Sequence, residues 1–158
     1  MHRIGIGNDI HRLTAGRPLI IGGVRIDSEF GGDGHSDADV LLHAITDAIL
    51  GAAALGDIGR HFPDSDERWR DADSVVFLRE AARLCRELGY SIANVDSTVN
   101  LERPKIRPYI EEMRRIISRE LRIEVDRISI KAKTGEGMDA VGEGRAIRAD
   151  AAVLLEKP

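Results

Sequence analysis

The chain has 158 residues, of which 42% are hydrophobic and 32% are charged, and its formal net charge is −4. This composition is typical of a soluble globular protein, and no apolar run approaches the roughly 18 residues that a membrane-spanning helix needs. The acidic balance, with one tryptophan, two tyrosines and three phenylalanines, argues against a nucleic-acid partner.

The chain is of a size at which one domain buries a substantial core, and no linker or change in composition divides it. We therefore expect a single domain over residues 1–158. The N-terminal stretch lacks the apolar core and cleavage site of a signal peptide, so we expect a cytoplasmic location without a membrane partner.

Strand-like and helix-like segments alternate along the chain, which predicts an α/β or α+β fold. The alternation in RIGIGN, residues 3–8, indicates a first strand. Two short apolar runs over 19–26 flank Gly22 and Gly23, a two-residue hairpin signal. Helices are expected over three later segments, 36–52, 74–88 and 108–121.

The second of these helices carries the single cysteine, Cys85, at an apolar helical position, where it is expected to be a small core residue. The last expected strand alternates apolar residues with Arg148 and Asp150, as in a sheet with one face covered. We therefore predict a mostly four-stranded sheet covered by helices on one face. The later strands are expected over 92–101, 127–133 and 145–156.

The segment NDIHR brings two metal-type ligands close together in the first strand. Residues two apart in a strand point to the same face, so Asp9 and His11 are expected side by side while Ile10 turns into the core. An Asp-x-His strand therefore offers two of the ligands that zinc prefers.

The segment HSDADVLLHAITD, residues 35–47, opens the first expected helix, with Ser36 as a candidate cap. Asp39, His43 and Asp47 are spaced by four and share one face of that helix. If the Asp-x-His strand faces His43, the three ligands form a zinc site with an open fourth position, which is typical of catalytic zinc. A zinc hydrolase and a nonenzymatic fold with surface charges are the alternatives.

Three loops carry further polar groups. In LGDIGRHFPDSD, carboxylates can take hydroxyl groups and glycines allow close approach of the backbone. In NLERPKIRP, backbone groups can meet a base, and Lys105 can meet a phosphate. In KAKTGEG, Thr134 suits a phosphate oxygen and Glu136 suits a Mg²⁺ ion. Together these loops indicate a nucleotide diphosphate and two metals.

Over almost its whole length the chain resembles the 2-C-methyl-D-erythritol 2,4-cyclodiphosphate synthase family of the non-mevalonate isoprenoid pathway. The resemblance rests on separated motifs that occur in the expected order. They are GNDIHR, GDGHSDADVLLHAITDAILGAAALGDIG, FPDSD, NVDSTV, ERPKIRP and KAKTGEG.

The resemblance implies a homotrimer of α/β subunits with an active site at each junction between neighbouring subunits. Asp9, His11 and His43 match the zinc ligands of the family. Glu136 matches the residue that meets a Mg²⁺ or Mn²⁺ ion bridging the two phosphates.

The resemblance also assigns substrate contacts. His35 and Thr134 match the residues that steady the reacting phosphate. The positions that match contacts to the methylerythritol, its 2-phosphate or the ribose are Ser36, Asp57, Ile58, Gly59, Phe62, Pro63, Asp64, Ser65 and Asp66. The positions that match the cytidine pocket are Leu101, Glu102, Arg103, Pro104, Lys105, Ile106, Arg107 and Lys133.

The implied reaction is intramolecular and makes the enzyme a phosphorus–oxygen lyase. The 2-phosphate of 4-diphosphocytidyl-2-C-methyl-D-erythritol 2-phosphate attacks the β-phosphorus, closes a cyclic diphosphate and expels CMP. No protein nucleophile is needed, because phosphoryl transfer relies mainly on positioning and on charge neutralisation. A zinc phosphohydrolase and a catalytically silent nucleotide-binding homologue are the alternatives to this activity.

Asp39 and Asp47 lie one turn on either side of His43 and are candidates to orient its ring. The segment AVGEGRAI departs from the family, because Glu143 and Arg145 have exchanged places. The family's arginine lies near the trimer axis, so the isoprenoid site proposed there is in doubt in this chain. The exchange is expected to preserve an intersubunit ion pair with its sense reversed.

Overall fold

The computed structural model describes all 158 residues, and its main element is a five-stranded sheet of order β4-β1-β7-β5-β6. Neighbouring strands run antiparallel, except that β5 and β6 are parallel. The four predicted strands of the sheet are all present. The sheet consists of β1 (His2–Ala15), β4 (Phe30–Asp33), β5 (Ser91–Asn100), β6 (Ile128–Lys133) and β7 (Ala146–Glu156).

The prediction of a mostly four-stranded sheet was wrong by one strand, because β4 was not expected. Its sequence is FGGD, and two glycines in four residues give little strand propensity. The strand forms because its backbone pairs with residues 12–15 of β1. The edge strand of the sheet therefore forms through backbone pairing with β1 rather than through the strand propensity of its own residues.

A separate hairpin joins β2 (Leu19–Ile21) to β3 (Val24–Ile26), as predicted. Gly22 and Gly23 form its turn with φ values of 59° and 76°, a backbone conformation that glycine adopts at little cost.

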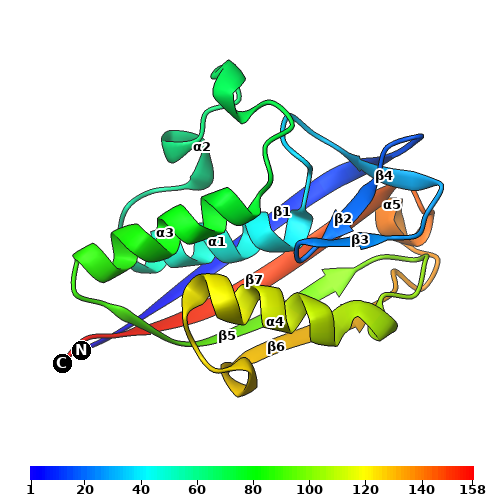
Figure 1. The fold of residues 1–158 in the computed structure, drawn as a ribbon. Coiled ribbons are helices and arrows are strands. Elements are labelled where there is room, and N and C mark those ends of the chain that lie inside the picture. Colours follow the sequence, from blue (N-terminus) through cyan, green and yellow to red (C-terminus); the bar gives the residue numbers. More distant parts are fainter.

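Three long helices lie on one side of the sheet, α1 (Val40–Ala52), α3 (Val75–Glu87) and α4 (Ile110–Leu121) (Figure 1). Two short helices, α2 (Ile58–His61) and α5 (Asp139–Gly142), lie in the connecting loops. None of the helices is long and apolar enough to cross a membrane. Cys85 of α3 is a fully buried free thiol, as predicted.

Helix α1 begins four residues later than predicted. Ala38 has a φ of 56°, which lies outside the right-handed helical region. Asp39 is the N-cap, because its side chain accepts the backbone N–H of Leu42 at 3.0 Å. Ser36 therefore does not cap the helix, and the expected start at residue 36 was wrong.

The contact between α1 and β1 depends on glycines. A Cβ atom at Gly5 would lie 1.9 Å from the carbonyl oxygen of Ala48, and one at Gly7 would lie 2.1 Å from that of Ala44. Glycine thus lets the helix backbone rest directly on the strand. This contact brings His43 of the helix over the part of β1 that follows Gly7.

The face of β1 opposite the helices is exposed. Ile4, Ile6 and Ile10 point to this face and are 75%, 78% and 57% exposed. The prediction that Ile10 turns into the core was wrong, because the helices cover the face of β1 that carries Gly7 and Asp9 rather than the face that carries Ile10. These three isoleucines form an exposed apolar row on the sheet.

A candidate metal centre in a polar cleft

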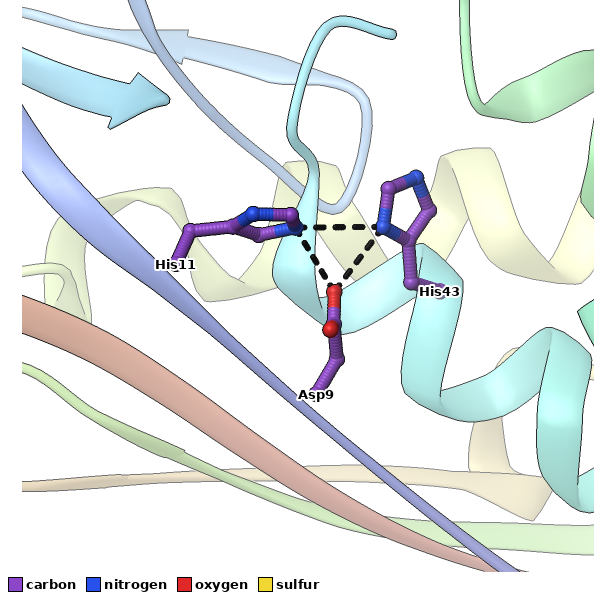
Figure 2. A group of neighbouring side chains, drawn as sticks. All are labelled: Asp9, His11 and His43. Atoms are coloured by element: carbon purple, nitrogen blue, oxygen red, sulfur yellow. Dashed lines mark hydrogen bonds and ion pairs between the residues drawn. The ribbon is translucent and has the colours of Figure 1, made fainter. Parts of the chain in front are cut away.

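Three predicted ligands meet where β1 passes the first turn of α1 (Figure 2). Oδ2 of Asp9 lies 2.7 Å from Nε2 of His11 and 2.9 Å from Nδ1 of His43. The two imidazole nitrogens are 3.3 Å apart. The strand and the helix that sequence alone left separate are thus in contact through these side chains.

The spacing of these atoms fits a zinc ion. Ligand atoms about 2.0–2.1 Å from a tetrahedral zinc lie about 3.3 Å from one another. The observed separations of 3.3, 2.9 and 2.7 Å are equal to that value or shorter by up to about 0.6 Å. Three side-chain ligands leave one position of a tetrahedron open, and that arrangement is typical of catalytic zinc sites.

One ring nitrogen of His11 is committed to the backbone. Its Nδ1 lies 3.1 Å from the carbonyl oxygen of Asp33, which can only accept a hydrogen bond. Nδ1 therefore donates to this carbonyl, and Nε2, 2.7 Å from Asp9, is the nitrogen left to bind a metal ion. A histidine that binds a metal through one nitrogen commonly donates from the other in this way.

The charges of the site reinforce one another. Burial raises the pKa of Asp9, but hydrogen bonds and charge from His11 and His43 outweigh it and lower the pKa to about 2. Burial opposes protonation of His11, yet the carboxylate of Asp9 raises its pKa overall. Asp9 is thus ionised at neutral pH, as a metal ligand must be.

Asp39 and Asp47 do not orient the ring of His43, so that interpretation was wrong. The carboxylate of Asp39 accepts from the turn amides of Gly22 and Gly23 at 2.9 and 2.7 Å, which ties the β2–β3 hairpin to α1. Oδ1 of Asp47 accepts from the N–H of Ile58 at 2.7 Å, at the start of α2. Both carboxylates hold backbone rather than the imidazole.

The triad lies in the wall of a cavity of about 490 Å³. The cavity combines imidazole and carboxylate groups with three aromatic side chains, a mixture typical of small-molecule sites. Its lining residues are Asp9, His11, Gly34, His35, Ser36, His43, Ile58, Gly59, Phe62, Pro63, Asp64, Trp69 and Phe77.

The structure places three of the expected loop contacts outside the lining of this cavity, namely Asp57, Ser65 and Asp66. Asp57 caps α2 by accepting from the N–H of Arg60. Asp66 is engaged by Arg68, whose Nη2 lies 2.6 Å from its Oδ2, and this hydrogen bond lowers the pKa of Asp66. The carboxylates of Asp57 and Asp66 therefore stabilise the structure of the loop in this chain.

The residues expected around cytidine line a second, smaller cavity. Its lining consists of Leu101, Pro104, Lys105, Ile106, Arg107, Ala132, Lys133 and Thr134. Glu102 and Arg103 lie outside that lining, and Oε2 of Glu102 accepts from the N–H of Gly135. Glu136 is exposed and accepts a 3.0 Å hydrogen bond from Oγ1 of Thr134.

The two cavities share no lining residue, so the predicted site residues that line a cavity fall into two groups on one chain. The first group holds Asp9, His11 and His43 with His35, Ser36 and the loop residues Ile58, Gly59, Phe62, Pro63 and Asp64. The second group holds the cationic residues Lys105, Arg107 and Lys133 with Thr134.

Three residues that line the first cavity, Gly34, Trp69 and Phe77, were not among the predicted site residues, and neither was Ser74, which contacts His43. Trp69 and Phe77 lie with their ring centroids 5.7 Å apart. Ser74 is fully buried, and its Oγ lies 2.8 Å from Nε2 of His43. Trp69 is the single tryptophan of the chain, which was a compositional signal, whereas nothing in the sequence marks Ser74.

The structure is an α/β fold in which β1 and α1 bring together an Asp-His-His group that could hold a metal ion, beside a cavity. Enzymes that use a metal ion have sites of this kind. The family model described as the YgbB family matches residues 2–156. The chain belongs to this family, whose members include the 2-C-methyl-D-erythritol 2,4-cyclodiphosphate synthases.

One relative is the 2-C-methyl-D-erythritol 2,4-cyclodiphosphate synthase of Solibacter usitatus, which is 57% identical over 98% of each chain. A solved structure of such a synthase in a CDP-bound form matches with a TM-score of 0.90 and 45% identity, covering 98% of this chain and all of that one. The bifunctional IspDF of Campylobacter jejuni matches with a TM-score of 0.96 and 37% identity; the match covers all of this chain and 43% of that protein.

Proposed function

We propose that this chain, as a single domain over residues 1–158, converts 4-diphosphocytidyl-2-C-methyl-D-erythritol 2-phosphate into 2-C-methyl-D-erythritol 2,4-cyclodiphosphate and CMP. It would do so in the cytoplasm as a phosphorus–oxygen lyase. The observation that carries the proposal is the convergence of Asp9, His11 and His43 within a few ångströms at a cavity. Identity of 57% to a synthase over nearly the whole chain supports the same reaction.

The residues of the chain would act by positioning and by balancing charge. His35 lines the metal-side cavity and can donate a ring N–H to a phosphate oxygen. The ammonium groups of Lys105 and Lys133 lie at the second cavity, where they can neutralise the diphosphate. Holding the 2-phosphate in line with the β-phosphorus replaces a protein nucleophile, since attack is then intramolecular.

Two kinds of metal ion fit the side chains. Asp9, His11 and His43 would hold Zn²⁺, and Glu136 offers an exposed carboxylate to Mg²⁺ or Mn²⁺. When bound, such ions act as Lewis acids that polarise phosphate oxygens and neutralise the charge that develops on them. The hydroxyl of Thr134 orients the carboxylate of Glu136 through their hydrogen bond.

We further propose that the enzyme is a homotrimer with its active sites between subunits. Two observations support this assembly. The metal-side and cytidine-side residues line separate cavities, so a neighbouring copy can supply the half that each cavity lacks. The exposed face of β1 carries three isoleucines, whose burial in an interface would be favourable by about 1.5–3 kcal/mol for each side chain.

Phosphorus NMR of the purified protein with the diphosphocytidyl substrate, Zn²⁺ and Mg²⁺ tests the activity. We expect the cyclic diphosphate and an equal amount of CMP, and we expect both to disappear in His43→Ala. Release of inorganic phosphate would instead identify a zinc phosphohydrolase. Unchanged substrate with bound zinc would identify a nucleotide-binding homologue without this activity.

A further inference from the structure

We propose that Ser74 and Asp37 are positioning residues that hold the ring of His43 with its Nδ1 free for a metal ion. The inference rests on the metal site of the proposed function and adds two residues to it. Asp37 precedes α1, whereas Ser74 stands at the start of α3. Two segments that are 37 residues apart thus meet behind the imidazole.

Asp37 begins a chain of hydrogen bonds whose direction is defined. Its Oδ2 accepts from the backbone N–H of Ser74 at 3.0 Å, and its Oδ1 accepts from the backbone N–H of Asp39 at 3.1 Å. The hydroxyl of Ser74 is also hydrogen-bonded to Oδ1. A carboxylate held by two N–H donors acts as an acceptor, so the hydroxyl of Ser74 is the donor in this bond.

The direction of that bond sets the tautomer of His43. Because the proton of the Ser74 hydroxyl points to Asp37, the oxygen turns a lone pair toward Nε2 of His43, 2.8 Å away. Nε2 is then the donor to Ser74 and keeps its proton. Nδ1, which lies 2.9 Å from Oδ2 of Asp9, is consequently the nitrogen that can give up its proton to bind a metal ion.

Ser36 is the other hydroxyl within reach of His43, but it is less suited to this role. Its Oγ lies 3.1 Å from Nε2, a longer distance than that of Ser74. It accepts from the N–H of Ala38 at 3.3 Å and has no carboxylate partner that would direct its proton away from the ring. Ser36→Ala is therefore a matched control.

The hydroxyl of Ser74 has no helix-capping bond to lose. Ser74 occupies the N-cap position of α3, yet its side chain makes no capping hydrogen bond there. The residue is fully buried, and its hydroxyl bonds only to Asp37 and His43. Removal of the oxygen should therefore affect the imidazole more than the helix.

The test is the zinc affinity of the purified protein, measured by competition with a chelating dye, together with the visible absorption of the Co²⁺-loaded form. Ser74→Ala is expected to lower zinc affinity about 10–100-fold and to change the Co²⁺ spectrum. Ser36→Ala and Ser74→Thr, which keeps the hydroxyl, are expected to stay within about threefold. Thermal unfolding of the metal-free proteins shows which variants are folded.

The outcomes separate the two proposals. If the unaltered chain binds no zinc, the metal site itself is wrong. If it binds zinc and Ser74→Ala binds equally well, the positioning role is wrong, and the same holds if Ser36→Ala causes the larger loss. If Ser74→Thr does not fold, Asp37→Ala repeats the zinc-affinity measurement without adding volume. Loss of the acceptor for the Ser74 hydroxyl should also weaken zinc binding, and unchanged affinity would overturn the role of Asp37.

Discussion

The close contact of α1 with β1 at Gly7 makes Gly7→Ala a sharp test of how the metal ligands are held together. A Cβ at Gly7 would lie 2.1 Å from the carbonyl oxygen of Ala44, whereas ordinary contacts begin at 3.4 Å. The helix must therefore move away by about 1.3 Å, and the blocking atom is backbone that no side-chain rotation can clear. His43 is the residue before Ala44, so it moves as well.

The expected effects follow from this displacement. Overpacking commonly costs about 1–3 kcal/mol, and a contact with helix backbone belongs at the upper end of that range. Metal–ligand distances tolerate only about 0.2 Å, so a shift of His43 by an ångström should lower zinc affinity at least tenfold. Chemical denaturation of the metal-free protein and chelator competition measure the two quantities separately.

Gly51→Ala is the matched control in the same helix. Apart from the adjoining backbone of its own helix, no atom lies within 4 Å of a Cβ built at Gly51, and alanine is favoured over glycine in helices by about 0.5–1 kcal/mol. We expect this variant to be slightly more stable, with unchanged zinc affinity. If Gly7→Ala matched the unaltered chain in both assays, the close contact would not be what places His43 over Asp9.

Three further outcomes are expected. Asp39→Ala should lower the free energy of unfolding, measured by chemical denaturation, by about 2–4 kcal/mol. The substitution removes the cap of α1 and leaves the turn amides of the β2–β3 hairpin without an acceptor. Burial raises the pKa of Glu120, but hydrogen bonds from Arg79 and a neighbouring arginine outweigh burial and lower the pKa. The ionised carboxylate therefore stabilises the fold above about pH 4.5, and this stabilisation is lost as the pH falls further. Glu120→Gln should be about 1–2 kcal/mol less stable at pH 7 and should lose less stability in acid than the unaltered chain. Exchanging Glu143 and Arg145 should change stability by less than about 1 kcal/mol, because the two exposed side chains pair with each other within one chain. The proposed trimer should stay intact in light scattering, and its dissociation would show that the two residues serve an interface.

The sequence determined the local structure well, because hydrophobic periodicity and turn residues act over short distances. Gly22 and Gly23 form the predicted hairpin turn, and the helix predicted over 74–88 occurs at Val75–Glu87. The pairing of Asp9 with His11 was also predictable, since the two residues share a strand face wherever that strand lies, and the structure brings both within reach of His43.

Only the tertiary structure decided which partners these residues meet. The spacing of Asp39, His43 and Asp47 predicted one polar face, but each aspartate bonds to backbone amides that the fold brings near it. Ser74 reaches His43 from another helix, and β4 forms through pairing rather than propensity. Contacts between distant segments depend on the packing of whole elements, and no local pattern of side chains encodes them.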